Sequence, residues 1–332
     1  MTDVTPAAPK PAPPAATPAP KRKRRGGVAS MLGIAAGLAG LAAGRLSALR
    51  IEFDVFNQFL PQFALVTAAF AIGYLMPRVR VLTALALIIA GLAANSLWPQ
   101  IRAAEPLAIA ASAQGERAIK IMTFNTWFAN QAVDAIGDEI EKQAPDIVMM
   151  VEFGPNKRPL FARFKGAYPH QLDCLEKDFC NLVVLSKFPF AATETRVGWN
   201  GPPVIRVAFG PELGGLNLFG VHTIRFPHQR AQFRQFVELA KMLEAYPGQQ
   251  IVMGDFNATR FSRMLASFEA SSGLNRLTGY LPTWPARFGM PQIGIDHIFA
   301  SPGIRPLAEI RIGANAGSDH FPVVATVAVP VN

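Results

Sequence analysis

The sequence predicts a layered α/β domain that follows three membrane-spanning helices. Three features of the 332-residue chain predict this arrangement. Long uncharged apolar stretches lie close together before residue 102, and their length is typical of helices in a bilayer. Beyond residue 116, apolar strand-like runs alternate with helical patterns, as they do in α/β domains. Ionisable residues recur where these predicted strands end, which indicates a site on one rim of the sheets.

Residues 1–25 are predicted to form a disordered tail on the cytoplasmic side. The first part of this tail is rich in Pro and Ala, and its end carries the basic cluster Lys21–Arg25. Polar, Pro-rich segments cannot bury enough apolar surface to fold. A basic cluster directly before an apolar stretch is retained in the cytoplasm.

Residues 26–101 are predicted to form a transmembrane region of three helices. A bilayer is spanned by about 20 mostly apolar residues, and three uncharged stretches have about this length: 26–44, 55–77 and 81–101. Two alternatives stay open, namely buried helices of a soluble fold, and a cleaved signal peptide for the first stretch. An odd number of crossings places the rest of the chain outside the cytoplasm, as in a multi-pass inner-membrane protein of a bacterial-type cell with a periplasmic domain.

The charge of the chain is concentrated in the tail. The whole chain has a formal net charge of +9, but from Glu116 onward there are 21 Lys and Arg against 19 Asp and Glu. The basic residues therefore act as a topology signal. A nucleic-acid partner stays possible, but the charge of the domain does not indicate one.

Residues 102–116 are predicted to be a linker, and residues 117–332 are long enough for one large domain. Continuous apolar strands in this domain indicate sheets that are covered on both faces. The pattern predicts helices over 132–143 and 228–246. It predicts strands over 118–125, 146–153, 181–186, 204–209, 216–223, 249–256, 295–301, 307–313 and 321–329.

Polar residues that could carry chemistry lie at the ends of these strands. Each of them alone has an ordinary structural explanation, such as a solvated strand end, a turn or a core histidine. Their repeated position at strand ends instead indicates one shared site. They are Asn125, Glu152, His222, Asp255 and Asn257 in "GDFNA", Asp296 at the start of its strand, and Asp319 with His320 in "SDHFPV".

This ordered set resembles the endonuclease/exonuclease/phosphatase family. The most specific pieces are "GDFNA" (254–258), "IDHIFAS" (295–301) and "SDHFPV" (318–323), with "LSKFP" (185–189) in support. The resemblance implies a layered two-sheet sandwich flanked by helices, and hydrolysis of phosphate esters. One departure is Val151, where the family often has Gln before the glutamate. A tyrosine that some members direct at the phosphate is not identified here.

The resemblance also implies a divalent metal, most often Mg²⁺, with Mn²⁺ or Ca²⁺ as alternatives. Glu152 is expected to coordinate it, with Asn125 and Asp319 nearby. These oxygen ligands are the kind that hard divalent cations prefer.

For the reaction itself, the resemblance implies five residues. Asp255 is expected to orient or deprotonate the attacking water, and Asn257 to hold that water or a phosphate oxygen. His320 is expected to lie against the phosphate and to be oriented by Asp296. His222 is expected to be a second phosphate contact or a general acid. The competing hypothesis is a non-catalytic binding module that retains the fold.

The two cysteines, Cys174 and Cys180, lie close together in "CLEKDFC". In an oxidising compartment such a pair is expected to form a disulfide. Buried free thiols are the alternative, and a zinc site would need two more ligands at short spacing.

Overall fold

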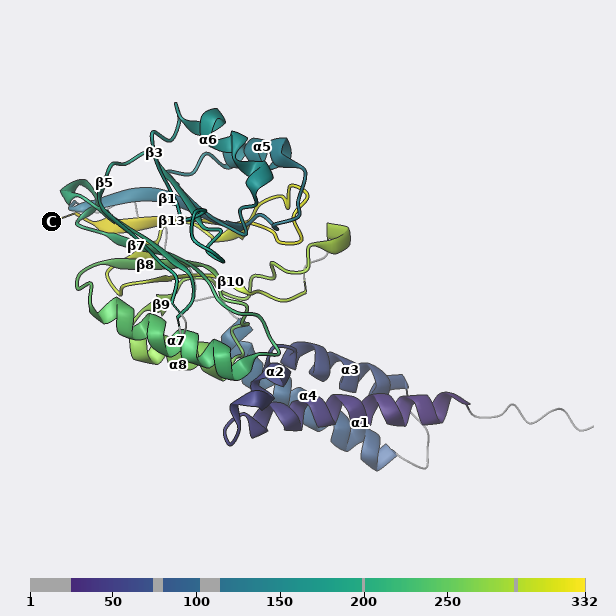
Figure 1. Ribbon diagram of the computed structural model, residues 1–332. Coiled ribbons are helices and arrows are strands. Elements are labelled where there is room, and N and C mark those ends of the chain that lie inside the picture. Colours follow the sequence, from purple (N-terminus) through teal and green to yellow (C-terminus); the bar gives the residue numbers. More distant parts are fainter. Residues whose placement is uncertain (1–24, 74–79, 102–113, 199–200, 290–291, 332) are drawn as a thin grey trace, which may run out of the picture.

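The computed structural model describes residues 25–73, 80–101, 114–198, 201–289 and 292–331 (Figure 1). Nearly all of the predicted tail and most of the predicted linker lie outside the described residues. The remaining chain forms a layered domain, drawn in the upper part of Figure 1, and a group of helices below it. The predicted two-sheet α/β sandwich flanked by helices is confirmed.

The first sheet contains the first and last strands of the domain. The strand order is β11-β13-β1-β2-β4-β3, and β12 also pairs with β13. β1 runs parallel to β2 and antiparallel to β13. The bounds are β1 Glu116–Asn125, β2 Ile147–Val151, β3 His170–Asp173, β4 Val183–Ser186, β11 Arg305–Pro306, β12 Arg311–Ile312 and β13 Val323–Pro330.

The second sheet has the strand order β5-β6-β7-β8-β10-β9. β7 runs parallel to β8, and β10 runs antiparallel to β8. The bounds are β5 Phe190–Arg196, β6 Val204–Phe209, β7 Asn217–His222, β8 Gln250–Asp255, β9 Asn275–Arg276 and β10 Asp296–Ala300.

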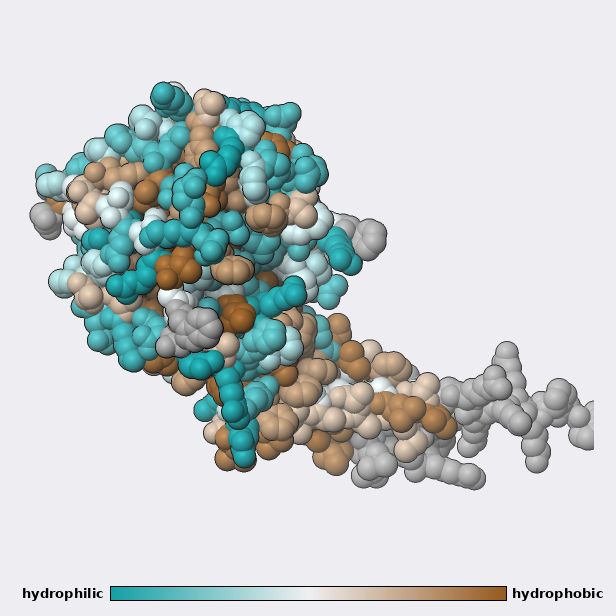
Figure 2. Space-filling model, in the orientation of Figure 1, coloured by the Kyte–Doolittle hydropathy of each residue, from teal (hydrophilic) through white to brown (hydrophobic). Residues whose placement is uncertain are grey.

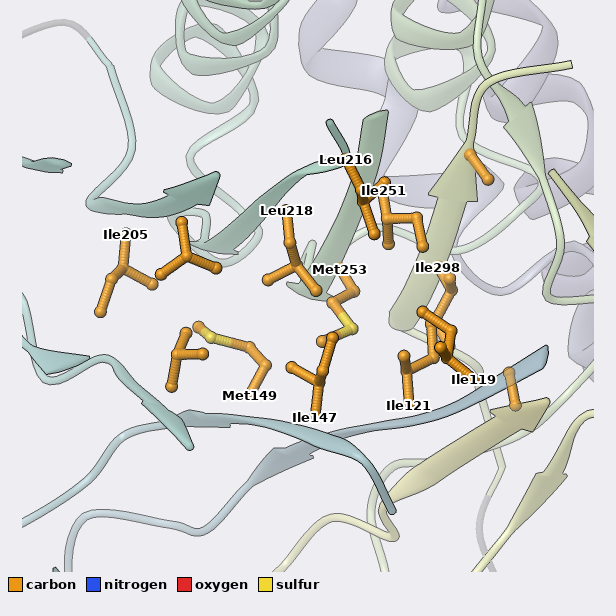
Figure 3. Packing of buried hydrophobic residues seen from close by; sticks show 14 of the residues in the cluster. Ile119, Ile121, Ile147, Met149, Ile205, Leu216, Leu218, Ile251, Met253 and Ile298 are labelled. Carbon is orange, nitrogen blue, oxygen red and sulfur yellow. The ribbon is translucent and has the colours of Figure 1, made fainter. Parts of the chain in front are cut away.

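The alternation of side chains along the strands builds three cores. Ile121 and Met149 face inward, where they meet Leu218 and Met253 of the second sheet (Figure 3). The neighbouring residue Met150 faces outward, into a core under the helices on the first sheet. This period of two explains why the central strands are apolar on both faces.

Helices cover the outer face of each sheet. α5 (Val133–Gln143) and α6 (Pro159–Phe164) pack on the first sheet through residues such as Ile136 and Phe164. α7 (Gln229–Glu244) and α8 (Arg263–Ser272) pack on the second sheet, where Phe236 and Phe268 meet Phe256. The domain therefore has four layers, helix, sheet, sheet and helix.

The N-terminal helices differ from the sequence prediction. α1 (Arg25–Leu46) contains one span, Val28–Leu46, that is long and apolar enough to cross a membrane. The predicted second stretch is broken into α2 (Asp54–Asn57) and α3 (Leu60–Gly73), with a bend of 57° between the flanking segments. In α4 (Arg80–Ile101) the side chains that the structure describes give a shorter apolar helix, Thr83–Ala93.

The predicted number of three membrane-spanning helices is therefore wrong. Among the described residues there is one candidate span, or two if the bent pair is counted as one. The bend has a physical reason, because the polar side chains of Asp54, Asn57 and Gln58 are buried at the junction with the α/β domain and not in an apolar helix face.

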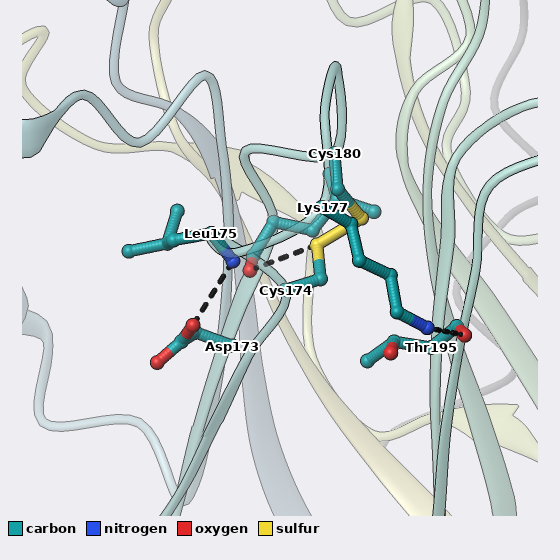
Figure 4. The surroundings of a disulfide bond; sticks show 7 residues. Asp173, Cys174, Leu175, Lys177, Cys180 and Thr195 are labelled. Carbon is teal, nitrogen blue, oxygen red and sulfur yellow. Dashed lines mark hydrogen bonds between the residues drawn. A yellow bond between two sulfur atoms is a disulfide. The ribbon is translucent and has the colours of Figure 1, made fainter.

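A disulfide closes the loop after β3 (Figure 4). The sulfur atoms of Cys174 and Cys180 are 2.06 Å apart, and both residues are buried. The loop is also held by a hydrogen bond from the Leu175 amide to Asp173 Oδ1 (3.0 Å). The Asn181 carbonyl, just beyond the loop, accepts a hydrogen bond from the Phe153 amide. The loop thus ends beside the residue that follows Glu152.

Candidate active site

Strand directions bring the polar strand ends to one rim. β1 and β2 are parallel, so Asn125 and Glu152 emerge on the same side. β7 and β8 are also parallel, and His222 lies opposite Asp255 in their register. The first residues of antiparallel strands also lie at this rim. Asp296 opens β10 opposite Asp255, and residues 319–320 lie just before β13 in the chain.

Asp255 lies at the centre of the group and is buried. Its Oδ2 accepts a hydrogen bond from Asn125 Nδ2 (3.0 Å), and its Oδ1 accepts one from the Asn257 amide (2.8 Å). The Nε2 atoms of His222 and His320 each lie 3.8 Å from Asp255 Oδ2. One carboxylate oxygen therefore faces an amide and two imidazoles contributed by three different elements.

His320 is held by Asp296. Its Nδ1 donates a hydrogen bond to Asp296 Oδ2 (2.9 Å), and both side chains are buried. This bond leaves Nε2 directed at Asp255. The backbone is fixed as well, because Ser318 Oγ accepts from the His320 amide (3.1 Å) and donates to the Asn125 carbonyl (2.7 Å).

Solvent reaches the site at Glu152 and His222, whose side chains are 29% and 25% exposed. Glu152 is held by several hydrogen bonds. Its Oε1 accepts from Asn125 Nδ2 (3.2 Å) and lies 3.7 Å from His222 Nε2. Its Oε2 accepts from the Phe128 amide (3.1 Å). The backbone φ of Glu152 is +52°, a region that L-residues rarely adopt. Such conformations cluster at functional sites, where surrounding contacts enforce them.

The turn after β8 also needs special backbone geometry. Gly254 has a φ of +147°, and a Cβ there would lie 2.0 Å from the Val221 carbonyl oxygen. Only glycine fits this position. Asn257 has a φ of +46°, and its Nδ2 donates to the Thr223 carbonyl (2.9 Å). The side-chain nitrogen of Asn257 is thus bonded to the backbone just after β7, while its backbone nitrogen is bonded to Asp255.

Burial and charge shift the pKa values of the site in opposite directions. The pKa of Asp255 is raised to about 8, because the carboxyl is buried and Asp296 lies beside it. Burial opposes the charged form of His320, but Asp296 outweighs it and raises the pKa to about 9. Burial lowers the pKa of His222. Burial also acts to raise the pKa of Glu152, yet the charge of His222 and hydrogen bonds keep it below the usual range.

Asp319 lies at the edge of the group. Its Oδ2 accepts a hydrogen bond from Trp284 Nε1 (3.2 Å), and its carbonyl accepts one from the Ala286 amide. The sequence analysis did not identify Trp284, which lies in a loop without periodic pattern. It also did not identify Lys157. The buried Nζ of Lys157 donates hydrogen bonds to the carbonyls of Trp127 (2.9 Å) and Phe128 (3.1 Å).

Within the described residues, two groups of side chains could hold a metal ion. One comprises Glu152, His222 and Asp255, and the other comprises Asp255, Asp296 and His320. In each group the candidate ligand atoms lie within 4.8 Å of one another. The buried Asp296 Oδ1 has no hydrogen-bond partner among the described residues. This oxygen of the second group is therefore free to coordinate a cation. Carboxylates predominate in both groups, which suits a hard divalent cation.

The sequence model of the endonuclease/exonuclease/phosphatase family matches residues 122–320. The chain belongs to this family. The matched residues run from β1 to His320 and include every predicted site residue. Family membership confirms the resemblance seen in the sequence, together with a phosphoesterase fold that has a candidate metal site. The role of each residue stays a prediction.

Solved structures share the fold of this family member. A Bacteroides vulgatus endonuclease/exonuclease/phosphatase is 18% identical, with a TM-score of 0.54 over 64% of this chain and 99% of that one. Sphingomyelinase C of Streptomyces griseocarneus is 18% identical, with a TM-score of 0.50 over 63% and 99%. D. rerio TDP2 complexed with a single-strand DNA product is 15% identical, with a TM-score of 0.51 over 63% and 98%. No curated protein sequence matches the chain.

Proposed function

We propose that this protein is a membrane-anchored, divalent-metal-dependent phosphoesterase that hydrolyses a phosphodiester or phosphomonoester by attack of water. The observation that carries the proposal is the environment of Asp255. This buried carboxylate is surrounded by Asn125, His222 and His320, and Asp296 lies behind His320. Apolar residues in these positions would stabilise the fold at least as well, so stability alone does not explain the polar group. Its arrangement suits proton transfer at an exposed rim.

Asp255 accepts the proton of the attacking water. A general base is most effective when its pKa lies near the working pH, and the pKa of Asp255 is raised to about 8. The hydrogen bond from the Asn257 amide orients the Asp255 carboxylate. The family resemblance implies that the Asn257 side chain, held by the hydrogen bond from its Nδ2 to the Thr223 carbonyl, contacts the attacking water or a phosphate oxygen.

His320 binds the phosphoryl group as a cation. The Asp296 carboxylate fixes its tautomer and stabilises its positive charge, so Nε2 is available to a phosphate oxygen. His222, whose pKa is lowered by burial, is the second phosphate contact or the general acid. The preorganised donors stabilise charge that develops on the phosphate in the transition state.

Glu152 would hold the divalent cation, with Asn125 and Asp319 as the further predicted ligands and Mg²⁺ as the expected ion, or Mn²⁺ or Ca²⁺. When bound, the cation neutralises charge on the phosphoryl group and assists the leaving group. The partly exposed Glu152 carboxylate gives access from solvent, and its position is fixed by the Phe128 amide.

The substrate belongs to the nucleic-acid class or to the phospholipid and inositol-phosphate class. Two of the related folds carry names that point in these directions, a sphingomyelinase and a protein complexed with a DNA product. The domain from Glu116 onward has 21 basic and 19 acidic residues, so its net charge does not favour nucleic acid. An apolar anchor would instead hold the site close to lipid.

The anchor is α1, and the domain lies outside the cytoplasm in this proposal. Exposed large apolar side chains among the described residues concentrate on the helices between Val28 and Leu92, which give the brown surface at the lower right of Figure 2. With the basic tail in the cytoplasm, α1 alone carries the chain across. The segment after α1 contacts the α/β domain, so the domain lies on the far side of the membrane.

The alternative for α1 is a signal peptide. A topology reporter fused after Asn332 tests this, and a cytoplasmic signal would contradict it.

The catalytic proposal is tested with the purified full-length protein in detergent, supplied with Mg²⁺ or Mn²⁺. The substrates are plasmid DNA, sphingomyelin, phosphatidylinositol phosphates and a generic phosphodiester. On any substrate that is cleaved, we expect Asp255→Asn and His320→Ala to lower kcat/KM by a factor of about 10²–10⁴.

Asp178→Asn and His228→Ala are matched controls, because both residues are exposed and lie outside the site. Both controls should retain the parent rate. A rate close to that of the parent in either site variant would contradict the assignment. Binding of a phosphate ester without turnover by the parent protein would favour the alternative, a binding module that retains the fold.

A further inference from the structure

A cavity of about 680 Å³ lies at the junction between the N-terminal helices and the α/β domain. Its volume is within the range of about 300–1,000 Å³ that is usual for small-molecule sites. It is separate from the group around Asp255, whose residues do not line it. α1 and α4 form its apolar side, and the segment from Arg260 to Arg263 forms its polar side.

The polar side of the cavity is basic. Arg45 lies near the end of α1, and Arg260 and Arg263 belong to the segment that leads into α8. In the part of the chain that the structure describes, none of these three guanidinium groups forms an ion pair. Arg260 is half-buried, and its Nε and Nη1 atoms are fully enclosed without a hydrogen-bond partner. A buried, unpaired guanidinium is unfavourable unless an anion binds it.

Two carboxylates, Glu269 and Asp54, lie near this basic side. The charge of Glu269 acts on Arg260, but Glu269 forms its ion pair with Arg276 (3.1 Å). The Asp54 carboxylate accepts hydrogen bonds from Ser262 Oγ (2.6 Å), the Arg263 backbone amide (2.9 Å) and Asn57 Nδ2 (2.7 Å). Its oxygens are therefore engaged with the backbone and side chains of the junction. Glu269 faces both Arg260 and Arg276, so a net positive charge remains beside the cavity.

The apolar side of the cavity comes from α1, which we propose to lie in the membrane, and from α4, which packs beside α1. Leu38 and Leu41 of α1 face it, as do Ile89 and Leu92 of α4. Leu92 is 64% exposed, although it lies on a helix whose composition is strongly apolar. The cavity thus offers a hydrocarbon-like wall on one side and three arginines on the other.

We propose that this cavity binds an anionic phospholipid, whose phosphate contacts Arg260 and Arg263 and whose acyl chains lie along α1 and α4. Arg45 provides a third positive charge at the headgroup. Guanidinium groups bind phosphate with paired, charge-assisted hydrogen bonds. A free phosphate ion would leave the apolar wall in contact with water, and an apolar ligand would leave Arg260 unpaired. The inference rests on the proposed membrane location of α1 but not on catalysis.

The position of the site suggests why a bound lipid would matter. Arg260 follows Asn257 by three residues, and the intervening Thr259 amide donates to Gln58 Oε1 (2.6 Å) in the N-terminal helices. The N-terminal helices already contact the segment 257–260 through this hydrogen bond. A lipid phosphate on Arg260 would add a second contact, between the same segment and the bilayer. We expect it to stabilise the junction.

The test uses the full-length Asp255→Asn protein in detergent, so that an added lipid is bound but not consumed. Dioleoyl phosphatidylglycerol is titrated while thermal unfolding is followed by tryptophan fluorescence. Dioleoyl phosphatidylcholine and inorganic phosphate are titrated in parallel. We expect the melting temperature to rise with phosphatidylglycerol only.

The variants Arg260→Gln and Arg263→Gln should raise the concentration for half of this shift at least tenfold. Arg45→Gln, at an exposed position that tolerates change, should raise it by a smaller factor. Arg234→Gln is the matched control on exposed α7 and should leave it unchanged. The proposal is overturned if all arginine variants respond like the parent, if phosphatidylcholine acts equally well, or if inorganic phosphate gives the whole shift. None of these outcomes depends on whether the parent protein hydrolyses a phosphate ester.

Discussion

Replacing Asp54 by Ala should destabilise the whole protein, because Asp54 connects the N-terminal helices to the α/β domain. The residue lies in α2, yet its carboxylate contacts the start of α8, more than 200 positions later in the chain. Ser262 is the N-cap of α8 and accepts from the Leu265 amide. A buried carboxylate at a helix N-terminus also interacts favourably with the helix dipole.

The size of the effect follows from three hydrogen bonds to a charged group, from Ser262, Arg263 and Asn57. Each such bond contributes about 1.5–3 kcal/mol when the partner groups are left without a substitute. Ser262 keeps its bond with Leu265, and Arg263 is an exposed residue, so water can replace the lost acceptor of its amide. We therefore expect a total loss of about 2–4 kcal/mol, which corresponds to a decrease in Tm of roughly 5–10 °C.

A double-mutant cycle measures the contact directly. The Tm values of Asp54→Ala, Ser262→Ala and the double variant are compared with the parent in the same detergent. Because the two side chains are in contact, the double variant should lose clearly less than the sum of the single losses. Asp178→Asn is the control on an exposed loop and should leave Tm unchanged. Strictly additive losses would refute a direct interaction between the helices and the domain.

Three further predictions concern metal binding, acid stability and the disulfide. Glu152→Gln should raise the Mg²⁺ or Mn²⁺ concentration needed for half-maximal activity, measured by metal titration after chelation; full activity of the chelated parent would exclude a metal mechanism. Burial, aided by the charge of Arg276, lowers the pKa of His297 to about 3, so the unfolded chain binds a proton that the folded chain does not, and stability is lost as pH falls below about 6.5. The loss should reach about 2 kcal/mol at pH 5; acid unfolding of His297→Gln should lack this component, and an unchanged pH profile would contradict it. Cys174 and Cys180 should resist thiol labelling in intact cells until reductant is added, and reduction should lower stability by about 2 kcal/mol for so short a loop.

The sequence predicted the central strands and the rim of the site, for a physical reason. Strands that are buried on both faces are continuous apolar runs, and a polar residue stands out where such a run ends. Asn125, Glu152 and Asp255 were found in this way. The parallel and antiparallel pairing that brings them together could be anticipated only through the family resemblance, because strand order is set by contacts distant in sequence.

Other parts of the fold gave no local signal. The strands β9 and β11 have two residues each, too few for a period of two to be recognised. The strand predicted over 307–313 is reduced to the two residues of β12. α8 was not predicted, although Ser262 caps it, because its apolar positions are diluted by Ser and Ala. Trp284 contributes to the site from a loop, and its hydrogen bond to Asp319 depends on tertiary structure alone.

The bend in the predicted second membrane span shows how tertiary contacts compete with an apolar composition. The stretch from Val55 to Pro77 is uncharged and long enough to cross a bilayer. It is broken because Asn57 and Gln58 find polar partners at the junction, and Gln62 reaches the Gln292 carbonyl. In lipid these amides would lack such partners, at a substantial cost in free energy. Two of the polar residues that weakened the apolar pattern, Gln58 and Gln62, therefore bind the α/β domain. This accounts for both the bend in the helices and the fixed position of the domain beside them.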